Sequence, residues 1–110
     1  MSTSSKQVAS DQGALADWLA ESNERLVVVA FTADWAGGAL ILRGFLDKIE
    51  RKLPDLQVYY VDADARQQLV ADMGVNQIPT VLLLRSQTVV DHIDGLIPRS
   101  KLAARIGAYL

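Results

Sequence analysis

Residues 26–53 constrain the fold of this chain more than any other stretch. The stretch begins with an unbroken apolar run, Leu26-Val27-Val28-Val29-Ala30-Phe31, which is typical of a β-strand buried on both faces of a sheet. It ends with apolar residues at helical spacing, namely Leu42, Phe45, Leu46, Ile49 and Leu53. A strand followed by a helix that packs on it is the unit of an α/β fold. The short turn between them therefore lies at the edge of the sheet where such folds usually carry their functional sites.

Patterns outside this stretch predict further elements of the same sheet. Leu15, Trp18 and Leu19 share one face of a helix expected over residues 11–22, and this spacing places Trp18 in the core. Strands are expected over residues 7–9, 58–61, 81–84 and 89–93, and a last helix is expected to begin at Pro98. The order of these elements predicts a mixed sheet with helices on both faces.

A helix over residues 65–73 carries both a start and a stop signal. Asp64 is expected to be its N-cap, with Gln67 completing a capping box. Gly74 follows the helix and suits the position just after a helix C-terminus.

Composition and charge exclude several classes of function. The chain has 110 residues, of which 50% are hydrophobic, and this fits one domain. We expect that domain over residues 7–110, after a polar, flexible tail over residues 1–6. The net charge of −2, without a basic block, leaves no electrostatic footprint for nucleic acid. No apolar run reaches the length of a membrane span, so we expect no membrane partner and a cytoplasmic location.

No motif for a nucleotide, a metal or an acid–base pair is present. Gly37-Gly38 could offer N–H groups to an anion, but no phosphate-binding glycine motif accompanies them, so a simple turn is the better interpretation. The aspartates near strand ends are best explained as a helix cap and as solvated positions, so neither a metal nor a cofactor is expected. His92 is the only histidine, and on an edge strand without a motif partner it is expected to have a surface role.

Three short segments resemble the thioredoxin family. They are Trp35-Ala36-Gly37-Gly38-Ala39 after the apolar strand, Ile78-Pro79-Thr80 further along, and Gly95 after the last strand. In thioredoxins a strand runs into Trp-Cys-x-x-Cys at the start of a long helix, and a cis-proline loop faces that motif. The resemblance covers residues 26–110 and implies the thioredoxin fold, an α/β fold with a mixed central β-sheet flanked by helices on both faces. It also implies a cis bond between Ile78 and Pro79.

The residues of thioredoxin chemistry are absent as a set. The chain has no cysteine, and Ala36 and Ala39 occupy the two thiol positions of the motif. A methyl group cannot act as a nucleophile, so we expect no disulfide exchange. The resemblance also implies that Ala30 replaces a buried carboxylate, that Tyr60 replaces a lysine and that Gly44 replaces a helix-kinking proline.

Two histories fit these replacements, and both stay open. In the first, the chain is a redox-inactive member whose supporting residues changed after its activity was lost. Alanine at position 30 favours this history, because a buried carboxylate is costly to keep when it has no task. In the second, the chain is a thiol-disulfide oxidoreductase whose two cysteines were replaced by alanine.

The resemblance implies that the peptide-binding surface survives. In thioredoxins the backbone before the cis-proline pairs with an extended peptide, a form of β-augmentation. We therefore expect a protein or peptide partner at Trp35, Gly37, Gly38, Leu40, Ile78, Pro79 and Gly95. Leu40 belongs to this set because its helical phase places it nearly opposite the buried stripe, exposed beside Trp35. Two alternatives stay open: these residues only shape the turn, or the chain is a structural subunit of a larger assembly.

Overall fold

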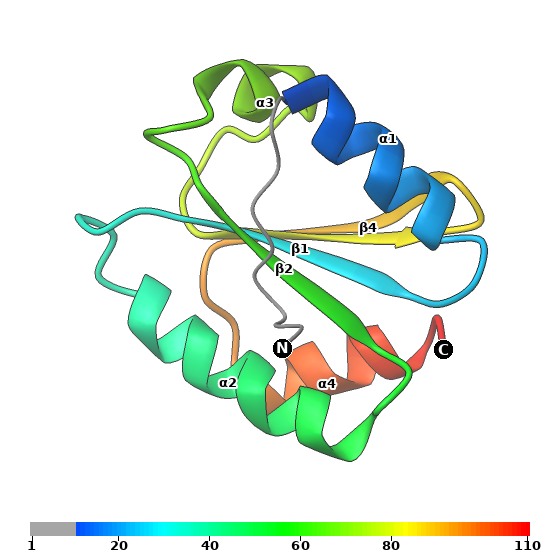
Figure 1. Ribbon diagram of the computed structural model, residues 1–110. Helices are drawn as coiled ribbons and strands as arrows, with labels where there is room; N and C mark the ends of the chain where they lie inside the picture. Colours follow the sequence, from blue (N-terminus) through cyan, green and yellow to red (C-terminus); the bar gives the residue numbers. More distant parts are fainter. Residues whose placement is uncertain (1–10) are drawn as a thin grey trace.

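The computed structural model describes residues 11–110 (Figure 1). Its elements are, in order, α1 (Asp11–Glu21), β1 (Val27–Thr32), α2 (Ala39–Lys52), β2 (Gln57–Asp62), α3 (Gln67–Asp72), β3 (Thr80–Arg85), β4 (Thr88–Asp94) and α4 (Arg99–Gly107). These bounds are close to the predicted ones. The expected strand over residues 7–9 and the expected tail over residues 1–6 lie outside the described residues. No helix within residues 11–110 is long and apolar enough to cross a membrane.

The sheet is mixed and has β1 near its centre. The strand order is β2-β1-β3-β4. β1 pairs with β2 in parallel and with β3 in antiparallel orientation, and β3 pairs with β4 in antiparallel orientation. All residues of β1 are buried, which agrees with the interpretation of the apolar run as a strand covered on both faces.

Two apolar cores form, one on each face of the sheet. Figure 1 shows α2 and α4 on one face and α1 and α3 on the other. Val28 and Ala30 of β1 belong to the core under α2 and α4. Val29 and Phe31 belong to the core under α1 and α3, because successive strand residues point to opposite faces. Trp18 also lies in this second core and is 3% exposed, so its predicted core position is confirmed.

α2 presents a narrow apolar stripe to the sheet. Leu42, Leu46 and Ile49 are buried along one side of the helix. Leu40 is 80% exposed and Ile41 is 50% exposed. The prediction that Leu40 points away from the core is therefore confirmed.

The prediction that Asp64 caps α3 is wrong. α3 begins at Gln67, and its N-cap is Arg66, without a side-chain cap hydrogen bond. The Asp64 carboxylate instead accepts hydrogen bonds from the indole N–H of Trp35. The stop signal is confirmed, because Gly74 follows the helix in the left-handed region, with φ of +67°.

Candidate functional site

The turn between β1 and α2 contains Ala36, and Ala39 is the first residue of α2. The Ala36 N–H donates to the carbonyl oxygen of Ala33 at 3.0 Å, and the Ala39 N–H donates to that of Ala36 at 3.1 Å. Gly38 is the N-cap of α2 and offers no side chain to the helix terminus. Ala36 is 8% exposed and Ala39 is partly exposed. The backbone thus places Ala36 in the turn before α2 and Ala39 at the first position of α2, and both side chains are methyl groups.

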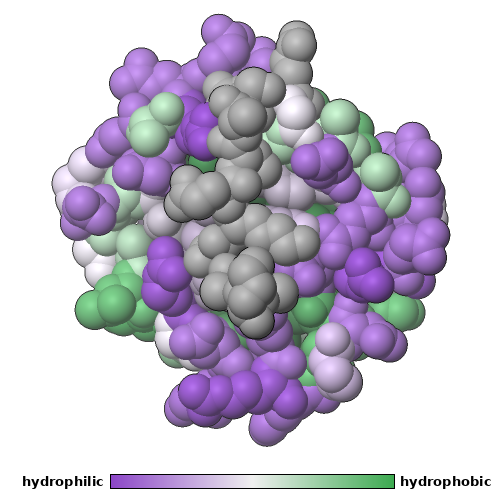
Figure 2. Space-filling model, viewed as in Figure 1, coloured by the Kyte–Doolittle hydropathy of each residue, from purple (hydrophilic) through white to green (hydrophobic). Residues whose placement is uncertain are grey.

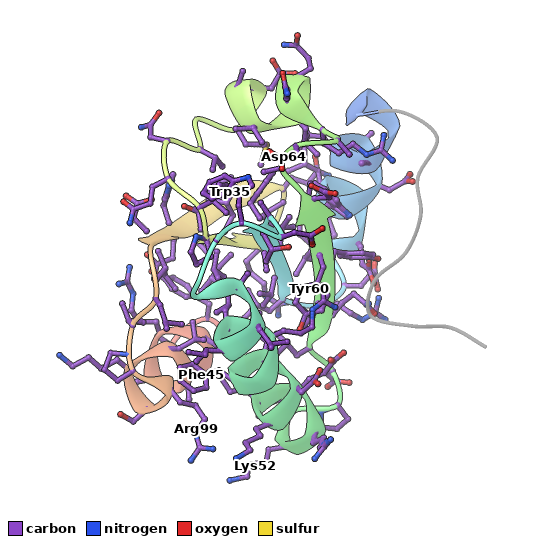
Figure 3. All side chains as sticks on the ribbon, turned by 90° about the vertical axis from the view of Figure 1, so that its left-hand side faces the viewer. Trp35, Phe45, Lys52, Tyr60, Asp64 and Arg99 are labelled. Atoms are coloured by element: carbon purple, nitrogen blue, oxygen red, sulfur yellow. The ribbon has the colours of Figure 1, made fainter. Side chains whose placement is uncertain are left out.

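Trp35 is exposed and is fixed at one edge of its ring. Its side chain is 65% exposed, the larger value of the two tryptophans. The indole N–H donates to both carboxylate oxygens of Asp64, with Nε1–Oδ2 at 2.9 Å and Nε1–Oδ1 at 3.2 Å. Figure 3 shows these two residues side by side beyond the start of α2. The pair connects the loop after β1 to the loop after β2 and holds the rest of the ring in solvent.

The loop before β3 has an unpaired stretch of backbone. The peptide bond between Ile78 and Pro79 is cis. The Pro79 carbonyl oxygen accepts a hydrogen bond of 2.8 Å from the Gly95 N–H. Within residues 11–110, the N–H and C=O of Ile78 make no hydrogen bond.

Three of the predicted binding residues come together on one side of the turn. A Cβ atom placed on Gly38 would lie 3.7 Å from Cγ of Pro79 and 3.4 Å from Cβ of Leu96. The carbonyl oxygen of Pro79 in turn accepts the hydrogen bond from the Gly95 N–H. Leu96 is 40% exposed and was missed by the sequence analysis, since it lies in a loop without periodicity.

Leu40 lies beside a small cavity near the start of α2. A small cavity of about 190 Å³ is lined by Thr32, Ala33, Asp34, Ala36, Ala39, Leu40 and Arg43. The structure thus brings Leu40 next to the former thiol positions Ala36 and Ala39. The binding role of the predicted residues stays a prediction.

No carboxylate lies at the strand position that matches the family's buried acid. Ala30 is fully buried, and its partner across the parallel strands is Tyr60. Burial raises the pKa of the Tyr60 phenol to about 12, and the negative charge of Asp47 adds to this effect. The Arg43 guanidinium carbon lies 3.9 Å from the centre of the Tyr60 ring. Tyr60 is therefore a neutral side chain near neutral pH and cannot replace the missing acid as a base.

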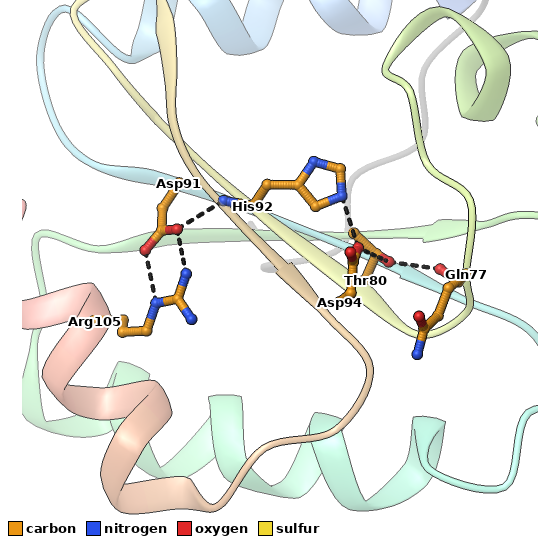
Figure 4. Close-up of polar contacts among 6 residues, drawn as sticks. All are labelled: Gln77, Thr80, Asp91, His92, Asp94 and Arg105. Carbon is orange, nitrogen blue, oxygen red and sulfur yellow. Dashed lines mark hydrogen bonds and ion pairs between the residues drawn. The ribbon is translucent and has the colours of Figure 1, made fainter.

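Polar contacts on β4 support the loop that contains Gly95 (Figure 4). The Thr80 hydroxyl donates to the carbonyl oxygen of Gln77 at 2.5 Å and lies 3.3 Å from Oδ1 of Asp94. His92 Nε2 lies 2.8 Å from the same Asp94 oxygen, and His92 is exposed, as expected for an edge strand. Asp94 directly precedes Gly95, so these contacts fix the segment that faces Pro79.

Comparison with known proteins assigns the chain to a family. The family model described as Thioredoxin matches residues 7–108. The chain belongs to the thioredoxin family. Thioredoxin of Bacillus subtilis is 29% identical to it over 92 residues, which make up 83% of this chain and 88% of that protein. Thioredoxin H1 of Arabidopsis thaliana is 29% identical over 91 residues, with 83% of this chain and 79% of that protein covered. The solved structure of Fasciola hepatica thioredoxin has a TM-score of 0.80 and 25% identity, covering 87% of this chain and 91% of that chain.

The thioredoxin fold is therefore present without the thiols on which disulfide exchange depends. The full sequence contains no cysteine. Within the described part of the chain, no group of three His, Asp or Glu residues is placed to hold a metal ion. What this thioredoxin-family protein keeps at the site is a helix start, an exposed indole and an unpaired backbone edge.

Proposed function

We propose that this protein is a redox-inactive member of the thioredoxin family that binds an extended segment of a partner protein. The observation that carries the proposal is the contrast at one site. The two thiol positions are Ala36 and Ala39, and the exposed Trp35 directly precedes them in the chain. Pro79, which follows the unpaired backbone of Ile78, lies close to Gly38 between the two positions. The surface can hold a peptide but cannot perform thiol chemistry on it.

The backbone of Ile78 supplies the main-chain part of the binding. An extended peptide gains affinity by adding hydrogen bonds to an unpaired strand-like edge. The loop is fixed from behind, because the Pro79 carbonyl oxygen is already bonded to Gly95. A partner therefore meets an edge that needs little ordering, which lowers the entropy cost of binding.

Exposed apolar side chains supply the second part. Those around the start of α2 and the Gly95 loop are Trp35, Leu40, Ile41 and Leu96. Figure 2 shows hydrophobic side chains gathered where α2 begins, on a face that is otherwise largely hydrophilic. Apolar side chains grouped on the surface of a small protein are typical of an interaction site.

The test is capture of partners from a lysate of the cells that make this protein. Immobilised protein is compared with Leu40→Asp and Leu96→Asp, which place a charge in the proposed surface. Leu110→Asp is the matched control, since Leu110 is 53% exposed and the C-terminus lies on the opposite side of the molecule from the start of α2 (Figure 1). We expect the first two variants to lose the partner and the control to retain it. Equal capture by all of them would place recognition elsewhere.

A second candidate is a thiol-disulfide oxidoreductase whose cysteines were replaced. The alanines at both thiol positions favour it, because replacement of two cysteines by alanine would leave this pattern. The double variant Ala36→Cys/Ala39→Cys distinguishes the two. Rapid reduction of insulin disulfides by this variant would support the second candidate. Weak activity, raised by adding Ala30→Asp, would show that the supporting residues are also missing and would favour the first.

A further inference from the structure

A second surface lies at the end of α2 that is far from Trp35. A groove of about 480 Å³ runs between the C-terminal half of α2 and the N-terminal half of α4. It is lined by Lys48, Ile49, Arg51, Lys52, Leu53, Arg99, Ser100 and Ala103. Figure 3 shows Lys52 and Arg99 at this end of α2 and Trp35 beyond its other end. The groove is therefore separate from the surface around Pro79.

The groove is basic. Its charged lining residues are Lys48, Arg51, Lys52 and Arg99, and no acidic residue lines it. Within residues 11–110, none of these side chains forms an ion pair or a hydrogen bond. The whole chain, in contrast, has a net charge of −2. Positive charge is concentrated here and is available to an anionic partner.

The acidic residues of α2 face the other way. At 100° per residue, Asp47 and Glu50 fall on one flank of the helix. Lys48 and Lys52 fall on the opposite flank. Asp47 and Glu50 are close enough to Tyr60 that both charges help to raise its pKa, after the larger effect of burial. Because the charges of α2 are separated in this way, the helix does not neutralise its own groove.

The floor of the groove is apolar. Ile49 is 6% exposed, and Leu53 and Ala103 are partly buried beside it. A bare inorganic anion gains nothing from apolar surface and would not need it. An apolar floor between cationic walls fits a ligand in which an apolar side chain is flanked by negative groups.

The start of α4 adds hydrogen-bond donors to the same groove. Pro98 is the N-cap of α4 and makes no side-chain cap hydrogen bond. The first helical bonds run from the N–H groups of Lys101 and Leu102 to the carbonyl oxygen of Pro98. Within residues 11–110, the N–H groups of Arg99 and Ser100 have no backbone acceptor. A carboxylate beside Arg99 could accept from them as well.

We propose that this groove binds an acidic segment of a partner protein. A leucine or phenylalanine of the segment enters between α2 and α4 and packs on Ile49. Neighbouring carboxylates meet Lys52 on one wall and Arg99 on the other. The recessed floor favours a protruding side chain over the flat surface of a membrane. The proposal does not depend on the function proposed for the surface around Pro79.

The test measures binding of a fluorescein-labelled synthetic peptide, Glu-Asp-Leu-Phe-Glu-Asp-Leu-Glu, by fluorescence anisotropy at low salt. Arg99→Glu and Lys52→Glu reverse one charge on each wall, and we expect each to weaken binding roughly tenfold. Lys101→Glu is the matched control for Arg99→Glu. It lies on α4, is exposed and makes the same charge change, but it does not line the groove. We expect this control to keep the affinity of the original chain within about twofold.

Three results would overturn the proposal. In the first, a peptide with Gln and Asn in place of Glu and Asp binds as well, which removes the role of the cations. In the second, Lys101→Glu weakens binding as much as Arg99→Glu, which would mean that the net charge of the protein, and not the groove, determines the affinity. In the third, the peptide does not bind, whereas vesicles containing anionic phosphatidylserine bind in a manner that Arg99→Glu abolishes. Circular dichroism of each variant establishes that it is folded.

Discussion

Trp35 and Asp64 are joined by a two-oxygen hydrogen bond between loops that follow different strands. The indole nitrogen lies 2.9 Å from Oδ2 and 3.2 Å from Oδ1. The two residues are 29 positions apart in the chain. The bond gives the exposed indole a defined orientation at the start of α2, where the family has its reactive site.

Removing this acceptor should loosen the indole with little loss of stability. For Asp64→Ala, we expect stronger quenching of tryptophan fluorescence by acrylamide and a faster anisotropy decay. Trp18 is 3% exposed and Trp35 is 65% exposed, so the change reports on Trp35. The free energy of unfolding should fall by about 1 kcal/mol or less, because the bond is exposed to water. Asp55→Ala, in an exposed turn on another loop, should leave the quenching unchanged.

Two leucines of α2 should differ sharply in their contribution to stability. Leu42 is 1% exposed and Leu40 is 80% exposed on the same helix. We expect Leu42→Ala to cost about 2–5 kcal/mol, because it leaves a cavity in the core. Leu40→Ala should change stability by less than about 0.5 kcal/mol. Urea denaturation followed by circular dichroism measures both. Similar values for the two variants would mean that the helical phase is wrong.

The ion pair between β4 and α4 should make stability depend on pH in the acidic range. Arg105 Nε donates to Asp91 Oδ2 at 2.9 Å, and a second guanidinium nitrogen contacts Oδ1. The Arg105 hydrogen bonds hold the pKa of the Asp91 carboxyl below its ordinary value.

A folded-state pKa below the unfolded one means that the stabilisation is complete above the unfolded value of about 3.9 and is lost as pH falls through the folded value. At neutral pH we expect Asp91→Asn to cost roughly 0.5–1 kcal/mol, since Arg105 is largely exposed. The difference between the two proteins in urea denaturation should shrink from about pH 5 downwards. A difference that stays constant to about pH 2 would show that packing, not charge, causes the loss.

The protein in its present sequence should not reduce insulin disulfides. The reaction needs a thiolate at the helix start, and the chain has no cysteine. We expect no turnover above a protein-free control between about pH 6 and about pH 9, a range that covers the ionisation of ordinary thiols. An active thioredoxin carried through the same purification is the positive control. Turnover that follows the protein through a further chromatography step would contradict the prediction.

The central part of the fold could be predicted because β1 and α2 each show their apolar pattern within a short stretch of sequence. The apolar run of β1 and the stripe of Leu42, Leu46 and Ile49 each follow from the geometry of one element. The exposure of Leu40 follows from the same phase. These predictions need no knowledge of what lies across the fold.

The rest depends on contacts between distant segments. Asp64 matched a local capping pattern, but its carboxylate accepts a hydrogen bond from Trp35, which lies in another loop. The position of Leu96 beside Gly38 is set by how two loops meet. The basic groove needs Lys52 of α2 and Arg99 of α4 on its two walls, and no pattern in the chain connects these residues.

The placement of β1 decides which amide hydrogens exchange last. This strand has neighbours on both edges, and its residues are buried beneath both helical layers. Solvent deuterium can reach amides in this position only when the domain opens as a whole. Exchange of the Val28 and Val29 amides should therefore report the global free energy of unfolding. A ligand that contacts only the loops will also slow exchange at these two amides, because it stabilises the folded state as a whole.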